Sequence, residues 1–176
     1  MKKILVSVVI LVGFFFALTA FVNNKPTEPK LKWISWQEAV ELNKTAPRKF
    51  IVDVYTDWCG WCKRMDKTTF ENDSVVNYLS KNFYCVKLNA EMHDIIEFQG
   101  HKFEYVKQGG SGVHTFAASL LDGNMSYPTV VYLTQNFERV IISPGYKEPK
   151  TIMPEMKYVA EEVYKTKTWK EYSGEK

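Results

Sequence analysis

Short runs of β-branched and aromatic residues alternate along this chain with amphipathic stretches and with polar, glycine-containing segments. Phe50–Tyr55 and Tyr84–Asn89 have the length and composition of strands. Thr129–Thr134 and Arg139–Ser143 have the same character and lie close enough in sequence to pair across Gln135–Glu138. The pattern therefore predicts four strands, of which the last two form a hairpin.

The start and the end of this region carry helical patterns. Ser35 with Glu38 three residues later is a capping-box sequence, which predicts a short helix. Its expected inward positions are Ala39, Val40 and Leu42. A last helix is predicted over about Thr151–Lys165. Its apolar face consists of Met156, Val159, Ala160 and Val163.

A further helical stretch lies between the first two strands. It runs from about residue 59 to residue 82 and should break near Glu71–Asp73, where Asp73 can cap the second half. Strands that alternate with helices and end in a hairpin and a helix predict an α/β fold. Its mixed central sheet would be flanked by helices on both faces.

The connection before the predicted hairpin contains an insert, at about residues 92–122. His101–Lys107 alternates like a strand, Gln108–Gly112 is turn-like, and Val113–Leu121 resembles a helix that Gly123 ends. Long connections in compact domains often serve a function. The sequence leaves open whether this insert docks a substrate or partner or is a decorative hairpin.

The N-terminal segment, residues 1–22, predicts export. Lys2 and Lys3 precede Ile4–Val22, which contains no charged residue. This pattern indicates either a signal peptide or an uncleaved membrane anchor, and both place the rest of the chain outside the cytoplasm. Residues 23–34, rich in proline and charge at the start, are expected to be a linker.

Composition narrows the function classes. The 176 residues suit one domain and carry a formal net charge of +3. Without Lys2 and Lys3, the chain has 21 basic and 20 acidic residues, a net charge of +1. This charge does not indicate nucleic-acid binding. Three cysteines are too few for a disulfide-stapled miniprotein.

The strongest chemical signal is Cys59-Gly60-Trp61-Cys62. Cysteines three residues apart on the first turn of a helix face the same side, close enough to form a disulfide. Cys59 would lie where unpaired backbone N–H groups and the helix dipole lower the pKa of a thiol. The pattern thus supplies a nucleophilic thiolate and, one turn further in, a second thiol that can resolve a mixed disulfide.

Residues 52–63, VDVYTDWCGWCK, resemble the active-site segment of the thioredoxin superfamily. Asp53 lies six residues before the first cysteine, and Trp58 adjoins it. Further matches are Lys87 in the next strand, the cis-proline turn at Tyr127-Pro128, and Gly145 after the hairpin. The resemblance covers about residues 35–165 apart from the insert and implies a thioredoxin-like domain over 35–170, with the insert before the cis-proline strand. It is most similar to extracytoplasmic, membrane-tethered thioredoxin-like reductases.

The resemblance implies a role for each matching residue. Cys59 would attack a substrate disulfide, and Cys62 would release the reduced product. Asp53 would relay the proton of Cys62, and Lys87 would tune Asp53; a purely structural Asp–Lys ion pair remains the alternative. The client would be bound by the aromatic and proline positions Trp58, Trp61, Tyr127 and Pro128.

Two departures from the family pattern qualify these expectations. Gly60-Trp61 replaces the usual Gly-Pro between the cysteines, so the redox potential cannot be carried over. The connection from Asn89 to Pro128 is about 20 residues longer than a compact member needs.

The function expected from the resemblance is a protein-disulfide oxidoreductase, with a reductase favoured and an isomerase or oxidase as the alternative. Its partners would be disulfide-containing proteins and a membrane thiol that supplies electrons. It would use no cofactor beyond the Cys59–Cys62 pair and would act outside the cytoplasm, in a bacterial periplasm, secreted or tethered to the inner membrane. Copper or zinc binding by the CxxC and a non-catalytic binding module are the alternatives. Cys85 and the three histidines show no ligand spacing and are expected to be packing or surface residues.

Overall fold

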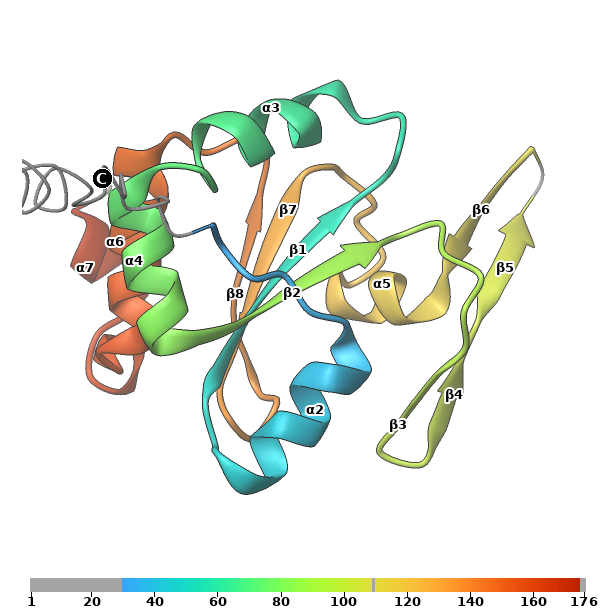
Figure 1. Cartoon of the computed structure of the whole chain (residues 1–176), viewed down its shortest axis with the longest axis horizontal. Coiled ribbons are helices and arrows are strands. Elements are labelled where there is room, and N and C mark those ends of the chain that lie inside the picture. The colour runs from blue at the N-terminus through green and yellow to red at the C-terminus, as the bar shows by residue number, and fades with distance from the viewer. Residues whose placement is uncertain (1–29, 109, 175–176) are drawn as a thin grey trace, which may run out of the picture.

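The protein is described by a computed structural model that covers residues 30–108 and 110–174. A four-stranded mixed sheet forms its centre, in the order β2-β1-β7-β8 (Figure 1). These strands are β1 (Lys49–Tyr55), β2 (Phe83–Asn89), β7 (Thr129–Leu133) and β8 (Arg139–Pro144). β1 runs parallel to β2 and antiparallel to β7, and β7 pairs antiparallel with β8. The four predicted strands and the terminal hairpin are therefore confirmed.

Helices cover both faces of the sheet. They are α2 (Trp36–Thr45), α3 (Gly60–Thr68), α4 (Asp73–Asn82), α5 (Thr115–Leu120), α6 (Pro149–Ala160), the 3-10 turn η1 (Val163–Lys165) and α7 (Trp169–Ser173). One apolar core joins α2 and α5 to the sheet, and the other joins α3, α4 and α6 to the opposite face. Figure 1 shows α3 across the end of the sheet at which β1 finishes. The predicted α/β architecture is thus confirmed.

The alternation along β1 explains why both faces need cover. Phe50, Val52 and Val54 belong to the core beneath α2 and α5, whereas Ile51 points into the other core. All four side chains are fully buried. A strand with two apolar faces is stable only between two layers, which is how central strands of α/β sheets are placed.

Two details of the first helices differ from the sequence prediction. Leu42 is 40% exposed rather than inward, because the buried stripe of α2 follows the spacing Trp36, Ala39 and Asn43. Asn72, not Asp73, caps α4, and its Oδ1 accepts hydrogen bonds from the N–H groups of residues 74 and 75.

The predicted last helix is also shorter at its C-terminal end. α6 ends at Ala160, and Glu162 adopts a left-handed φ of 57°, which interrupts the helix before η1. Val163 consequently lies in the 3-10 turn and not on the α6 face. The short helix α7, capped by a reciprocal Thr168–Glu171 box, was not predicted at all.

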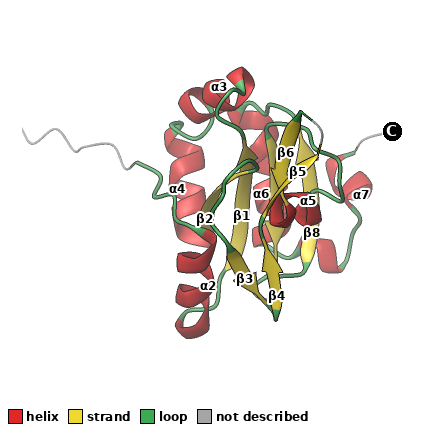
Figure 2. Cartoon of the chain, turned by 90° about the vertical axis from the view of Figure 1, so that its right-hand side faces the viewer, coloured by secondary structure: helices red, strands yellow, loops and turns green. Residues whose placement is uncertain are grey.

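The insert forms two hairpins followed by α5, and faces the viewer in Figure 2. β3 (Ile96–Phe98) pairs with β4 (His101–Phe103), and β5 (Tyr105–Gln108) pairs with β6 (Ser111–His114). The single strand expected over 101–107 is therefore wrong, because the chain leaves the first hairpin at Glu104 and starts a second one. The expected helix over 113–121 begins later, since His114 caps α5 through Nδ1, which accepts from the Phe116 N–H.

The insert is packed onto the domain by aromatic rings. Trp36 of α2 contacts Phe98 and Phe116 at centroid distances of 4.9 and 4.6 Å. Trp36 is only 3% exposed, and the same cluster includes Phe50 of β1. The insert therefore shares the core beneath α2 and is no detached hairpin.

The predicted export segment, residues 1–22, lies outside the described residues. Part of the expected linker over 23–34 is described and contacts the sheet: the Ile34 N–H donates to the Cys85 carbonyl at 2.9 Å, and its carbonyl accepts from the Lys87 N–H at 3.3 Å. Within residues 30–108 and 110–174, no helix has the length and apolar character needed to span a membrane.

Candidate active site

Cys59 and Cys62 form a disulfide at the start of α3. The S–S distance is 2.08 Å and the Cα atoms are 5.3 Å apart. Cys59 is the N-cap of α3, in extended conformation, and its Sγ accepts a hydrogen bond from the Cys62 N–H at 3.1 Å. The same N–H would face a Cys59 thiolate, and together with the helix dipole it stabilises the negative charge. Because only 5% of Cys59 and 2% of Cys62 are exposed, access to the pair is narrow.

A buried acid and a lysine lie on the adjoining strands. The parallel register of β1 and β2 sets Asp53 opposite Lys87, and Lys87 Nζ lies 2.5 Å from Asp53 Oδ2. The Asp53 side chain is 1% exposed. Its second oxygen, Oδ1, is buried and has no hydrogen-bond partner among the described residues. That oxygen is therefore free to hold or accept a proton.

Lys87 has a second carboxylate partner that sequence reasoning missed. Its Nζ also contacts Asp66 Oδ1 on α3, and the Asp66 side chain is 39% exposed. Lys87 thus links a buried acid to one that reaches solvent. Asp66 lies four residues after Cys62 on the same helix, so i,i+4 spacing could have placed both on one face. Aromatic rings of Trp33, Tyr55 and Phe70 surround the Lys87 ammonium at 4.9 to 5.8 Å.

The electrostatics of this cluster move the titration of Asp53 closer to neutral pH. Burial raises the pKa of Asp53 from 3.8 to about 6, against the opposing effect of Lys87. For Lys87, burial disfavours the ammonium, but Asp53 and Asp66 outweigh it and raise the pKa of the lysine. Asp53 is thus poised to exchange a proton at the pH of most cells, while Lys87 stays charged.

The Tyr127-Pro128 peptide bond is cis, as the resemblance implied. Pro128 is buried at the start of β7, and its carbonyl accepts from the Gly145 N–H at 2.8 Å. Gly145 has a φ of 83°, a left-handed conformation that favours glycine over residues with a Cβ. This hydrogen bond ties the end of β8 to the cis-proline turn.

Two tryptophans beside the cysteines are largely exposed, Trp58 by 67% and Trp61 by 56%. The Trp58 Nε1–H donates to both carboxylate oxygens of Glu91, at 3.0 and 3.1 Å, and the Trp58 ring lies 5.9 Å from that of Tyr127. Exposed large aromatics beside a reactive pair are candidates for client contacts. No sequence signal pointed to Glu91.

Cys85, His114 and His93 have structural contacts in this arrangement. Cys85 is a free thiol, 4% exposed, and burial raises its pKa to about 12. His114 is buried in its capping role, and His93 lies against the Tyr105 ring at 4.1 Å. Among the described residues, no group of three or more His, Cys, Asp or Glu side chains could hold a metal ion. Cys85 as a packing residue is confirmed.

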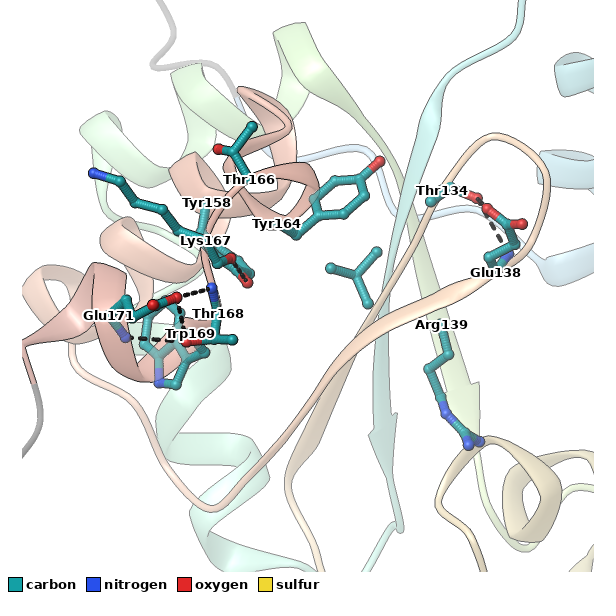
Figure 3. A pocket seen from close by; sticks show the side chains of 11 residues that line it. Thr134, Glu138, Arg139, Tyr158, Tyr164, Thr166, Lys167, Thr168, Trp169 and Glu171 are labelled. Atoms are coloured by element: carbon teal, nitrogen blue, oxygen red, sulfur yellow. Dashed lines mark hydrogen bonds between the residues drawn. The ribbon is translucent and has the colours of Figure 1, made fainter.

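A pocket of about 620 Å³ opens elsewhere, between the β7–β8 hairpin and the C-terminal helices (Figure 3). Several of its polar side chains are hydrogen-bonded to one another. The hydroxyl of Thr134 donates a hydrogen bond to the Glu138 carboxylate, and that of Thr168 donates to the Glu171 carboxylate, as the dashed lines in Figure 3 show. Neither Cys59 nor Cys62 lines this pocket. The disulfide, not the pocket, therefore carries the chemistry.

Comparison with known proteins identifies the fold. A model of the family Thioredox_DsbH, described as "Protein of unknown function, DUF255", matches residues 17–175. A structure titled "DsbH Oxidoreductase" aligns with a TM-score of 0.53 at 14% identity, over 80% of this chain and 92% of that one. A thioredoxin from Thermus thermophilus aligns with a TM-score of 0.56 at 17% identity, over 74% and 88%. The fold is therefore the thioredoxin fold.

Among curated proteins, a protein disulfide-isomerase of Schizosaccharomyces pombe is 31% identical over 102 residues. The match spans 49% of this chain and 28% of that protein. The first curated relatives are matched over less than a third of their own length, in two cases over about a tenth. These relatives carry most of their length outside the region that this chain resembles.

Proposed function

Because the chain belongs to the Thioredox_DsbH (DUF255) family and holds a CxxC disulfide in a thioredoxin fold, we propose that it is a protein-disulfide reductase acting outside the cytoplasm. The observation that carries the proposal is the Cys59–Cys62 disulfide at the N-terminus of α3. A cysteine in that position is activated as a nucleophile, and its neighbour three residues on can close the cycle.

The reaction begins with the dithiol form. The Cys59 thiolate attacks one sulfur of a client disulfide, which forms a mixed disulfide and releases the other client sulfur as a thiolate that takes up a proton. Cys62 then loses its proton and attacks Cys59 Sγ, which frees the second client thiol and closes the Cys59–Cys62 disulfide. Two electrons pass from the protein to the client, and the client gains two protons.

Asp53 serves the second step as a general base. Its free Oδ1 accepts the Cys62 proton, and its pKa of about 6 suits proton exchange near neutral pH. Lys87 holds Asp53 in place through Oδ2 and leaves Oδ1 available. In this proposal Lys87 is a positioning residue, since it acts on Cys62 through Asp53.

The client segment lies over the disulfide between the exposed tryptophans. Trp58 and Trp61 offer exposed apolar surface next to the cysteines in sequence, and Tyr127 contacts Trp58 at the cis-proline turn. Pro128 follows Tyr127 at the start of β7 and fixes the path of that turn. These four residues form the proposed client-binding surface.

The cycle needs no bound cofactor, because the cysteine pair stores both electrons. Outside the cytoplasm a membrane thiol would have to reduce the pair again, and the uncharged segment at residues 4–22 supports that location. The Asp53–Lys87 pair matches the reductase pattern. Isomerase activity is the alternative, favoured by the similarity to the Schizosaccharomyces pombe disulfide-isomerase.

Two measurements on the full chain test this function. Cys62→Ser should trap clients as mixed disulfides on Cys59, whereas Cys59→Ser should trap none and show no turnover. A trap that collects no disulfide-linked protein would overturn the mechanism. Equilibration in thiol buffers decides the direction: a potential near that of thioredoxin, about −270 mV, supports the reductase, and one near about −180 mV supports the isomerase.

A further inference from the structure

The two exposed tryptophans next to the cysteines have neighbours of opposite charge. The Trp58 indole N–H donates to the Glu91 carboxylate. The Arg64 guanidinium lies over the Trp61 indole ring, with its Cζ atom 5.2 Å from the ring centroid. An aromatic surface that carries both an acidic and a basic neighbour can distinguish clients by charge.

Trp61, Arg64 and Tyr146 form the basic group, here named the arginine patch. Arg64 Cζ lies 5.5 Å from the Tyr146 ring centroid, and the rings of Trp61 and Tyr146 are 5.5 Å apart. Trp61 and Arg64 share one face of α3, since they are three residues apart. The Tyr146 hydroxyl is fixed by a 2.9 Å hydrogen bond with the Thr68 hydroxyl on the same helix.

Arg64 is exposed, and the contacts of its guanidinium among the described residues are with the two rings, not with a carboxylate or carbonyl. Its five N–H donors are thus held beside two rings. Arginine presents such donors as a planar fork that fits a carboxylate with two parallel hydrogen bonds. Packing against the rings reduces the conformational entropy that an exposed arginine would lose on binding.

The arginine patch also adjoins the proposed client path. Tyr146 follows Gly145, whose N–H is bonded to the Pro128 carbonyl in the cis-proline turn. Trp61 lies between the two cysteines in sequence. A client chain that reaches Cys59 along this turn therefore passes the patch.

We propose that the arginine patch binds a carboxylate side chain of the client close to its reactive disulfide. This inference rests on the proposed oxidoreductase function and names the class of client: disulfide-bonded segments with an acidic residue near one cysteine. Glu91, which accepts from the Trp58 indole, would repel the same carboxylate, so the two charges together favour one placement of the segment.

The test uses single-turnover reduction of disulfide-linked peptides by the dithiol form of the full chain. The peptides differ only in carrying Glu, Gln or Lys at each of three positions on either side of the cysteine. At one position, the Glu peptide should be reduced about 1.4 to 5 times faster than the Gln peptide, the range expected for an exposed ion pair. The Lys peptide should be reduced more slowly than the Gln peptide, and added salt should bring the reduction rates of the peptides closer together.

Variants assign the effect to Arg64. Arg64→Gln should bring the Glu-to-Gln rate ratio to about one, and Arg64→Glu should reverse the preference in favour of Lys. Lys81→Glu, an equal charge change at the exposed end of α4, is the matched control and should leave the ratio unchanged. Because Arg64 is exposed, both variants should fold, which near-UV circular dichroism verifies.

The outcomes separate this inference from the function on which it rests. If no peptide is reduced, the proposed function fails, and the arginine patch fails with it. If all peptides are reduced at equal rates, the oxidoreductase function stands, and the proposal that the arginine patch binds a client carboxylate is wrong. The carboxylate-binding proposal is also wrong if Arg64→Gln keeps the preference for the Glu peptide, or if Lys81→Glu removes that preference.

Discussion

Lys87 Nζ lies 2.5 Å from Asp53 Oδ2, across the parallel pair of β1 and β2. The lysine also forms an ion pair with Asp66, so one ammonium group pairs with a buried carboxylate and with a partly exposed one. Burial of Asp53 costs free energy that Lys87 offsets only in part, because the pKa of the acid remains raised. A site that keeps such a group at the expense of stability is typical of proton chemistry.

This raised pKa predicts how the stability of the oxidised protein depends on pH. With a folded pKa of about 6 and an ordinary value of 3.8, Asp53 keeps its proton longer in the folded state. Its favourable contribution is complete below about pH 4 and is lost as the pH rises through 6. The free energy of unfolding should therefore fall by up to about 3 kcal/mol relative to Asp53→Asn over this interval.

Denaturant titrations of both proteins between pH 4 and pH 8 measure this difference. Parallel stability curves for the wild type and Asp53→Asn would show that Asp53 does not titrate in this window. Activity supplies a second readout. Asp53→Asn should slow the release of client from the mixed disulfide, and unchanged release would make Asp53 structural only.

Asp66→Asn should lower the pKa of Asp53. The negative charge of Asp66 raises that pKa, and its removal also leaves Lys87 to Asp53 alone. The carboxyl carbon of Asp53, followed by NMR over pH, reports the shift directly. Glu71→Gln, an exposed charge change just beyond α3, is the control and should not move the titration. A midpoint that stays fixed in Asp66→Asn contradicts the coupling.

Cys85 should take no part in the redox cycle. Its thiol is buried and its pKa is raised to about 12, so almost no thiolate exists near neutral pH. Alkylation of the reduced native chain should modify Cys59 at the start of α3 first and Cys85 only after unfolding. Cys85→Ala should keep full turnover at a cost of about 1 kcal/mol in stability. Loss of turnover in that variant would identify a third redox thiol instead.

Trp36→Ala should destabilise the domain and loosen the insert together. The Trp36 ring contacts Phe50 of the sheet as well as Phe98 and Phe116 of the insert. Removing a buried tryptophan side chain typically costs about 3–5 kcal/mol. Limited proteolysis should then cleave the insert, at about residues 92–122, faster than the rest of the domain. Trp36→Phe is the milder control, and equal protection of the insert in both variants would show that it is held by other contacts.

Local patterns predicted the parts of this protein that depend on neighbours in sequence. β-branched runs located the four strands of the sheet, and Ser35 marked the start of α2. The CxxC spacing predicted the Cys59–Cys62 disulfide, because residues three apart at a helix start face one side. Helix ends were less well predicted, since Asn72 and Glu162 use cap and left-handed conformations that several residue types can adopt.

The sequence by itself determined the reactive pair and the layered α/β architecture, because both follow from short-range spacing and apolar periodicity. Only the tertiary structure brought Asp66 to Lys87, Glu91 to Trp58, and Tyr146 to Arg64. Each of these contacts joins residues from different elements. Which residues meet in these contacts depends on how α3, the strand ends and the connecting loops pack in space. A local sequence pattern does not contain that information.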